Sequence, residues 1–405
     1  MKYHTSLLCC IGSVIAAVNA QVYTLNATIP WKPKTPSSVD QSTIYNGTYY
    51  LSDRTNGGVQ VISLADDSQI TLIKGFTTTI VNNTVMKTES GPNGLRVIPD
   101  RNELYATDAH GIVKVIDLFS LEIIANISIG GIMRADEIGY DPTTSTIVVS
   151  NGDDATPFVA VINSTTQTVL GHLQFPGATG LEQPTINPAD DKFYIAIDSD
   201  PTLPGGGIAI LDLSNPSNYS ISSVIPLVDC IPGGITFGSK KNELFVSCSG
   251  SQFSTFGIET SYIIDVTTGD IKANISGVSG VDQVAYSDVT TYFYATAYQD
   301  ETSSGSPSPY LFVIAANGTV VQKIVTDNVT AHSVAVEAGT GTLVVPGKEK
   351  GVLVFDLTTG TSSANASSTT TGSAATASAT SGVQNLVGNV VAVLGSASLA
   401  ALMLL

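Results

Sequence analysis

The sequence predicts an all-β fold, a seven-bladed β-propeller of four-stranded blades, and two observations carry this prediction. Short runs rich in Val, Ile, Tyr and Phe alternate with turn residues, and no long stretch shows helical periodicity. One kind of run occurs seven times: GVQVISLADD from Gly58, GIVKVIDLFS from Gly111, FVAVINSTTQ from Phe158, GIAILDLSNP from Gly207, SYIIDVTTGD from Ser261, LFVIAANGTV from Leu311 and GVLVFDLTTG from Gly351. Seven copies of one strand type indicate seven repeats.

A second strand type precedes most of these copies, as in ELYATDA from Glu103 and KFYIAIDSD from Lys192. An inner strand lies ahead of that one, so the unit has four strands and a period of about 40 to 50 residues, as in a propeller blade. An open stack of blades would leave unpaired edges, which favours a closed ring. A two-domain array of β-sandwiches would not be expected to give such an even repeat.

The two ends of the repeat region are expected to share the last blade. The C-terminal unit stops after its third strand, GVLVFDL, and the segment QVYTLNATIPW from Gln21 supplies a strand without a partner. Pairing these two segments would complete the blade and tie the ring shut.

The ends of the chain predict export and a lipid anchor. Residues 1–20 read as a signal peptide that ends in Val18-Asn19-Ala20, in preference to a buried first helix. The propeller is expected over 21–360, a Ser/Thr/Ala-rich stalk over 361–382, and a removed GPI-attachment signal over 383–405, with attachment at Ser381 or Gly382. A plain transmembrane anchor is the alternative, but no Lys or Arg follows the apolar tail.

Glycosylation motifs and cysteines agree with an exported protein. Sequons occur at Asn26, Asn46, Asn82, Asn126, Asn163, Asn218, Asn274, Asn317, Asn328 and Asn365. Removal of the signal peptide leaves Cys230 and Cys248, for which an oxidising compartment favours a disulfide. Two reduced thiols on a metal would need more soft ligands than the chain offers.

The overall charge argues against nucleic-acid binding. The formal net charge is -17, and Lys and Arg together number 17 among 405 residues. No basic stripe is available to meet phosphates. We therefore expect a small molecule or a cell-surface partner, membrane attachment through the lipid anchor alone, and a monomer.

The blade endings KVIDLFSLEIIANISIGG and YIIDVTTGDIKANISGVSG resemble the repeats of YVTN-type, YncE-like seven-bladed propellers, over about Tyr45 to Leu357. The signal, stalk and tail also resemble those of secreted, GPI-anchored fungal-type surface proteins. More particular motifs are similar to those of one subgroup: GPNG at Gly91, RADEIGYDP at Arg134, LEQP at Leu181, CIPGG at Cys230, VDQVAY at Val281 and AHSVAV at Ala331. The resemblance implies the fold and no particular reaction. The segment from Tyr45 to Ser63 offers no comparable motif.

These motifs fall just before or at the start of the innermost strand of each repeat, so they should meet at one mouth of the central channel. The candidates are Arg96, Asp136 or Glu137, Glu182 or Gln183, the Cys230 loop, Asp282 or Gln283, and His332 followed by Ser333. Strand alternation predicts that Glu137, aligned with Glu182, faces the channel. Arg134 is expected to pair with Asp136.

If Glu137, Glu182 and Asp282 converge, their repulsion must be relieved by protonation, by Arg96 or by a cation. Carboxylate oxygens suit calcium or magnesium, and His332 alone does not make a zinc site. A polar channel that holds only water and structural hydrogen bonds would explain the same residues. For His332, a hydrogen bond to a neighbouring blade's backbone is as good an interpretation as a catalytic role.

Two functions from different classes follow. The first is a cell-surface propeller, at the plasma membrane or cell wall, that binds a small ligand or partner at the channel mouth. The second rests on analogy with the gluconolactonase-like propellers, which hold a divalent cation at the channel mouth: it is a divalent-metal-assisted lactonase, isomerase or cyclase, in which Glu137, Glu182 and Asp282 hold the metal and His332 moves a proton. The chain has no GxSxG, GxxxxGK[ST] or HExxH motif, which disfavours serine, nucleotide and zincin chemistry. Whether the three carboxylates meet decides between the two.

Overall fold

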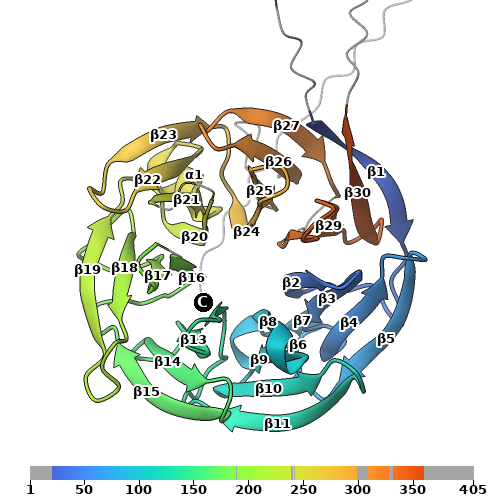
Figure 1. Ribbon diagram of the computed structural model, residues 1–405, viewed down its shortest axis with the longest axis horizontal. Coiled ribbons are helices and arrows are strands. Elements are labelled where there is room, and N and C mark those ends of the chain that lie inside the picture. Colours follow the sequence, from blue (N-terminus) through green and yellow to red (C-terminus); the bar gives the residue numbers. More distant parts are fainter. Residues whose placement is uncertain are drawn as a thin grey trace, which may run out of the picture. The chain divides into compact units, whose positions relative to one another are not determined.

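The structure is a computed structural model that describes residues 21–187, 189–238, 240, 242–298, 309–327 and 332–359. In this part of the chain, seven four-stranded antiparallel sheets stand around a central channel (Figure 1). The predicted seven-bladed β-propeller is therefore confirmed. The segments predicted to be a signal peptide, a stalk and a GPI signal, with Ser381 and Gly382, lie outside the described residues, as do the sequons at Asn328 and Asn365.

Each blade runs from the channel outwards in chain order. Blade 1 contains β2 (Val39–Tyr45), β3 (Thr48–Asp53), β4 (Gly58–Ser63) and β5 (Ser68–Lys74). Blade 2 contains β8 (Leu95–Ile98), β9 (Glu103–Asp108), β10 (Ile112–Asp117) and β11 (Glu122–Ser128). Blade 3 contains β12 (Ile138–Asp141), β13 (Thr146–Asn151), β14 (Phe158–Asn163) and β15 (Thr168–Gln174).

The remaining complete blades repeat this order. Blade 4 contains β16 (Pro184–Asn187), β17 (Lys192–Ile197), β18 (Gly207–Asp212) and β19 (Ser220–Pro226). Blade 5 contains β20 (Pro232–Phe237), β21 (Glu243–Cys248), β22 (Thr260–Asp265) and β23 (Ile271–Ser276). Blade 6 contains β24 (Val281–Ser287), β25 (Tyr292–Ala297), β26 (Tyr310–Ala315) and β27 (Val320–Val325).

Blade 7 is built from both ends of the described chain. Its strands are β28 (Ala335–Val336), β29 (Leu343–Pro346), β30 (Val352–Thr359) and, outermost, β1 (Gln21–Ile29). Strand β1 pairs antiparallel with β30, which confirms the expected closure (Figure 1). The Tyr23 hydroxyl lies 2.7 Å from the Tyr294 hydroxyl of blade 6 and donates to Gly341 O at 2.9 Å, so β1 also ties two blades together.

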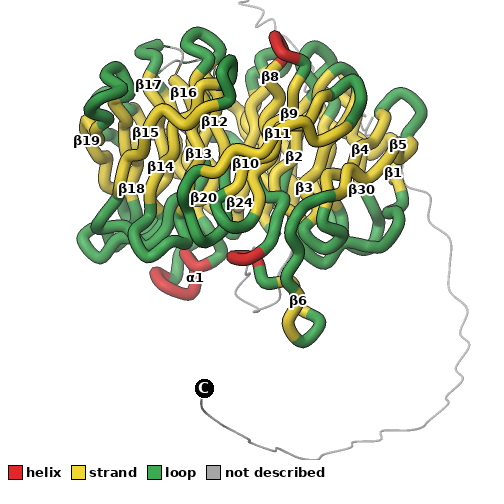
Figure 2. The backbone as a smooth tube through the Cα atoms, turned by 90° about the horizontal axis from the view of Figure 1, so that it is seen from below, coloured by secondary structure: helices red, strands yellow, loops and turns green. Residues whose placement is uncertain are grey.

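Short elements interrupt the connections between strands. They are β6 (Ile80–Val81), β7 (Thr84–Val85), the 3-10 helices η1 (Lys87–Glu89) and η2 (Pro99–Arg101), and α1 (Ser251–Phe256). The face of the ring at which the inner strands begin is called the mouth face below. The hairpin β6–β7 and α1 both project from it (Figure 2).

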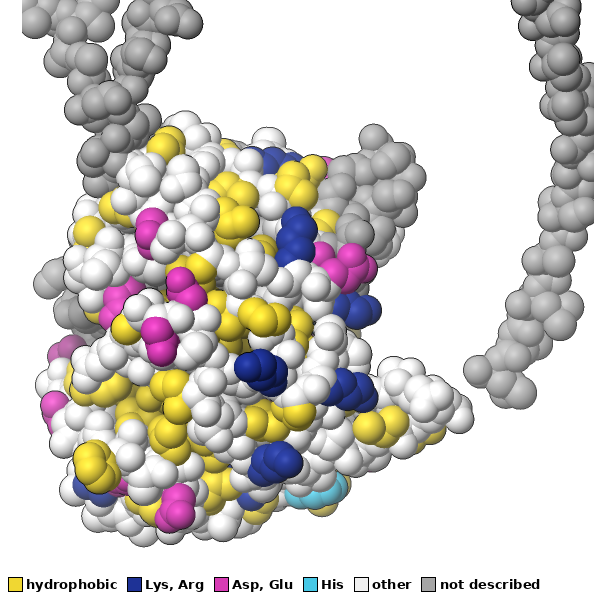
Figure 3. Space-filling model, turned by 90° about the vertical axis from the view of Figure 1, so that its right-hand side faces the viewer, with side chains coloured by type: hydrophobic (Ala, Val, Ile, Leu, Met, Phe, Trp, Pro, Cys, Tyr) yellow, Lys and Arg dark blue, Asp and Glu magenta, His cyan; other side chains and the backbone are white. Residues whose placement is uncertain are grey.

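Burial follows the position of a strand in its blade. Middle strands such as β13 and β14 are buried almost throughout because neighbouring blades pack on both of their faces. Outermost strands such as β11 and β15 alternate between exposed and half-buried residues, since only one face is covered. The outer wall in Figure 3 accordingly shows hydrophobic side chains scattered among polar and charged ones.

Cys230 and Cys248 form the predicted disulfide. It joins the loop before β20 to the end of β21 at the mouth face, and both residues are fully buried. No helix in the described residues is long and apolar enough to cross a membrane.

The described sequons lie mainly away from the mouth face. Outermost strands carry Asn26, Asn126 and Asn274, and strand ends or turns at the opposite face carry Asn46, Asn163, Asn218 and Asn317. Asn82, in the turn of β6–β7, is the exception. All of these side chains are exposed except that of Asn163, which is half-buried. Glycans at these positions would leave most of the mouth face open.

Candidate ligand-binding site at the channel mouth

Two consecutive residues at the start of each inner strand surround the channel mouth. In blade 3, Asp136 N donates to Ser150 O, and Ser150 N donates to Glu137 O, both at 2.9 Å. We call the position of Asp136 the first mouth position and that of Glu137 the second mouth position. The same backbone exchange with the neighbouring strand defines both positions in blades 2 and 4.

Strand registers and an inter-blade bond from Gln283 N to His332 O (3.2 Å) locate the two positions in the other blades. The first mouth positions are Asp40, Asn93, Asp136, Glu182, Gly233, Asp282 and His332. The second mouth positions are Gln41, Gly94, Glu137, Gln183, Gly234, Gln283 and Ser333. Most of the motifs therefore do converge on one mouth.

The register corrects two details of the sequence interpretation. Glu182 is equivalent to Asp136, and not to Glu137 as expected. Arg96 lies two residues beyond the second mouth position of its blade, inside the channel, and makes no described ion pair with a carboxylate. In blade 5 the Cys230 loop brings only glycine to both mouth positions, so it contributes no side chain there.

Blade 1 contributes two mouth residues that the sequence interpretation missed, Asp40 and Gln41. Their motif lies ahead of Tyr45, where the resemblance to the propeller family begins. A signal was present, because VDQ at 39–41 repeats VDQ at 281–283. Strands β2 and β24 also share a register shift after their first residue, which sets the two motifs in equivalent places.

The carboxylates of Glu137, Glu182 and Asp282 meet. One oxygen from each lies within 4.8 Å of the others. Glu137 is buried and the other two side chains are half-buried. These are the three residues that the sequence nominated as metal ligands, and they come from blades 3, 4 and 6.

Glu137 is held by two amide groups from across the ring. Gln41 Nε2 donates to Oε2 at 3.0 Å, and Gln283 Nε2 donates to Oε1 at 2.9 Å. The orientation of Gln41 is fixed because its Oε1 accepts from Leu95 N at 2.7 Å. Ser333 Oγ donates to Gln283 Oε1 at 2.9 Å. Both oxygens of Glu137 thus accept hydrogen bonds, which favours the ionised form.

Two arginines neutralise the other carboxylates of the mouth. Arg54 forms a buried ion pair with Asp40 and donates from Nε to Asn93 Oδ1 at 2.7 Å. Arg134 contacts Asp136 (Nη2 to Oδ2, 2.6 Å) and Asp153 (Nε to Oδ2, 2.6 Å). The expected pair of Arg134 and Asp136 is therefore present.

His332 lies beside the three carboxylates. Its Nδ1 is 2.7 Å from Asp282 Oδ2, and its ring stacks on Tyr298 with the centroids 3.9 Å apart. Burial lowers the pKa of His332, which favours the neutral imidazole. With Asp282 accepting the Nδ1 proton, the Nε2 atom carries the lone pair.

The electrostatics of the mouth are dominated by burial. Burial raises the pKa of Glu137 and of Glu182 well above the usual range, and neighbouring carboxylates raise both further. Burial also raises the pKa of Asp198, next to Glu182, to about 6. Asp282 differs: burial alone would raise its pKa, but the hydrogen bond from His332 and the nearby positive charges of Lys87 and Arg54 lower it.

Glu182 has no hydrogen bond or ion pair to its carboxylate among the described residues. The cluster therefore presents an ionised Asp282, a Glu137 held by donors, and an unpartnered Glu182 around one point. A point surrounded by carboxylate oxygens attracts protons, or a cation that prefers oxygen ligands, such as calcium or magnesium.

Comparisons with known proteins address the fold alone. No protein-family model and no curated protein matches the sequence. Among solved structures, the WD40 β-propeller domain of Doa1 aligns with a TM-score of 0.62 and 13% identity, over 83% of this chain and 97% of that one. This chain has the β-propeller fold. Hydrazine synthase of Kuenenia stuttgartiensis gives a TM-score of 0.64 and 13% identity, over 82% of this chain and 98% of that one. At 13% identity, the similarity to these two structures shows the fold and does not indicate a reaction.

Proposed function

We propose that this propeller binds a divalent cation at its channel mouth and uses that cation to hold a small oxygen-rich ligand. The convergence of Glu137, Glu182 and Asp282 within 4.8 Å supports this most directly. Calcium binds oxygen at 2.3 to 2.6 Å, so two ligands of one ion are at most about 5 Å apart. The observed spacing fits that limit.

Protons or a cation could relieve the repulsion in this cluster, and its hydrogen bonds favour a cation. The two amide donors on Glu137 and the histidine on Asp282 favour ionised carboxylates. Arg54 and Arg134 are already paired with other acidic groups. The positive charge of Lys87 acts on Asp282, so the negative charge of Glu137 and Glu182 is left for a cation to neutralise.

Three protein oxygens would leave coordination positions for a ligand, since calcium takes six to eight oxygens. Hydroxyl or carboxylate oxygens of a small ligand could occupy them. His332 lies at the edge of the same mouth and offers a hydrogen bond to the bound molecule.

The setting we propose is the cell surface. The apparent signal peptide, the sequons and the apolar C-terminal tail support secretion, glycosylation and a GPI anchor. The repeat motifs support membership of the YncE-like propellers. The positions of the described sequons support a free mouth face, at which a ligand could arrive without meeting glycans.

The experiment compares thermal unfolding of the purified, metal-stripped chain with and without calcium or magnesium. Wild type, Glu182→Gln and the control Glu122→Gln, which changes an exposed residue of β11, are measured side by side. We expect the cation to raise the melting temperature of wild type and of the control, and not that of Glu182→Gln. An equal rise in all three proteins would refute the site.

A catalytic role is the second candidate, and two observations favour it: the meeting of the three carboxylates and the pair of His332 and Asp282. A neutral imidazole with a free Nε2, placed beside a cation site, is suited to moving a proton. The reaction would be a metal-assisted lactone hydrolysis, isomerisation or cyclisation. A screen of lactones and isomerase substrates tests it: turnover that falls in His332→Asn while cation binding persists would support catalysis, and no turnover with wild type would leave binding alone.

A further inference from the structure

A cavity of about 240 Å³ occupies the channel beyond the mouth. A layer of polar side chains separates it from the three carboxylates: Gln41 and Gln283 bind Glu137, and Ser333 bonds Gln283 and Ser42. From this layer the cavity continues along the inner strands towards the opposite end of the channel. It is therefore a separate site.

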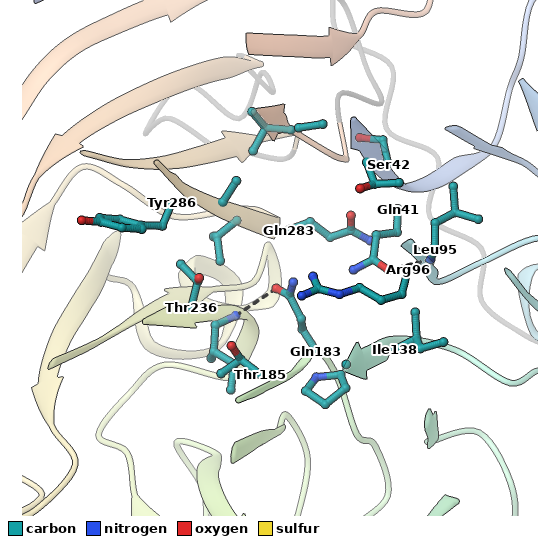
Figure 4. Close-up of a pocket in the computed structure, with 18 of the residues that line it drawn as sticks. Gln41, Ser42, Leu95, Arg96, Ile138, Gln183, Thr185, Thr236, Gln283 and Tyr286 are labelled. Carbon is teal, nitrogen blue, oxygen red and sulfur yellow. Dashed lines mark hydrogen bonds between the residues drawn. The ribbon is translucent and has the colours of Figure 1, made fainter. Parts of the chain in front are cut away.

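Arg96 is the one charged side chain that lines this cavity, within the described residues. It extends from β8 across the lumen towards Gln183 (Figure 4). The equivalent positions in the other six blades hold short side chains or none: Thr43, Gly139, Thr185, Thr236, Ala285 and Ala335. Space is thus left around the guanidinium group, with three hydroxyl groups at the same level.

Arg96 has no hydrogen bond or ion pair among the described residues, in contrast to Arg54 and Arg134. No carboxylate of the described residues lines the cavity. Partial desolvation by the channel wall lowers the pKa of Arg96, yet a guanidinium group stays protonated at neutral pH. Its side chain is exposed to the open space of the channel, so the guanidinium group is accessible to a small anion that enters the cavity.

We infer that the channel cavity is a binding site for a small oxyanion, a carboxylate or a phosphate. Arg96 would hold two of its oxygens in a bidentate contact, as guanidinium groups do with planar or tetrahedral oxyanions. The hydroxyls of Thr43, Thr185 and Thr236 would donate to the remaining oxygens or to hydroxyl groups of the ligand. This site is distinct from the cation site of the proposed function, because it has the opposite charge and lies beyond the glutamine layer.

Calorimetric titration with citrate and with inorganic phosphate tests the inference, with sodium chloride at matched ionic strength as the blank. Wild type is expected to bind one equivalent of at least one probe. Arg96→Gln should weaken that binding about tenfold or more, because a charge-assisted bidentate contact is lost. The control Arg101→Gln, which removes a partly exposed arginine of the same blade, should bind as wild type does. Preference for one probe identifies the ligand as a carboxylate or a phosphate.

Two further variants separate the role of the Arg96 charge from that of the cavity wall and of the cation site. Thr185→Val retains the charge and should weaken binding less than Arg96→Gln does. Glu182→Gln removes the proposed cation ligand and should leave anion binding unchanged, so the two sites can fail independently. Absence of saturable binding by wild type, or unchanged affinity in Arg96→Gln, would overturn the anion site.

Discussion

Gln283 of blade 6 donates a hydrogen bond to Glu137 of blade 3 across the channel mouth, with 2.9 Å between Nε2 and Oε1. The two residues are 146 positions apart in the chain. The same amide nitrogen also donates to Asp40 Oδ1 at 3.0 Å. One side chain thus links three blades, so the mouth is held together by its polar groups as well as by the packed blades.

The ion pair of Asp40 and Arg54 should be a major contributor to stability. Both side chains are buried, and burial lowers the pKa of Arg54 to about 10. Arg54→Met should lower the free energy of unfolding by about 3 to 5 kcal/mol, because it strands a buried carboxylate. Chemical denaturation of the double variant with Asp40→Leu should show a smaller loss than the sum of the two single losses. Additive losses would show that the two charges are not coupled.

Stabilisation by the cation should increase with pH. The pKa values of Glu137 and Glu182 are raised in the folded protein, so without metal these groups favour folding below their usual value of 4.5. That contribution is lost as pH rises through the raised values, and a cation can then take the place of the protons. The rise in melting temperature with calcium should be larger near pH 8 than near pH 5. A rise that does not depend on pH would contradict the assignment of these two carboxyls.

The disulfide of Cys230 and Cys248 should stabilise the fold. It closes a short loop, with a sequence separation of 18. Replacing both residues by alanine should cost about 3 kcal/mol in denaturant unfolding, since the loop is no longer constrained in the unfolded chain. Wild type under strong reductant serves as the comparison and should lose a similar amount. An unchanged midpoint in both would contradict the prediction.

Closure of the ring should depend on the hydroxyl of Tyr23, which contacts Tyr294 and Gly341. Tyr23→Phe should lower the free energy of unfolding by about 1 to 3 kcal/mol, because the buried Tyr294 hydroxyl and Gly341 O would each lose a hydrogen bond. Tyr45→Phe is the matched control, since Tyr45 is half-buried and its hydroxyl makes no hydrogen bond among the described residues. Equal stability of the two variants would argue against a tie at this point.

The fold could be predicted from the sequence because one strand type recurs at even spacing. The closure by β1 could be predicted because one strand lacked a partner at one end of the repeat region. The disulfide could be predicted because Cys230 and Cys248 are the two cysteines of that region. The set of converging carboxylates was also predicted, since Glu137, Glu182 and Asp282 lie in motifs at one phase of the repeat. Repetition carries this information, because equivalent residues reach equivalent heights along the channel.

Details of register could not be predicted from alternation alone. Irregular pairing at the start of inner strands, as between Val281 and Val284, lets two successive residues turn towards the mouth. The carboxylates of Glu137 and Glu182 therefore meet although Glu137 occupies a second mouth position and Glu182 a first mouth position. The sequence interpretation also missed Arg54, which follows the second strand of blade 1. It lies 15 positions after Val39 in the chain, and its Nη1 donates a hydrogen bond to the carbonyl oxygen of Val39. Only the folded blade brings these residues together.

The most direct test of the cation site is calorimetric titration of calcium into the metal-stripped chain at neutral pH, with Glu182→Gln and Glu122→Gln beside wild type. We expect one ion per chain in wild type and in Glu122→Gln, and an affinity about tenfold lower or worse in Glu182→Gln, because a carboxylate ligand is lost. No saturable binding of calcium or magnesium by wild type, or the same affinity in Glu182→Gln, would contradict the proposal that the three carboxylates hold a cation.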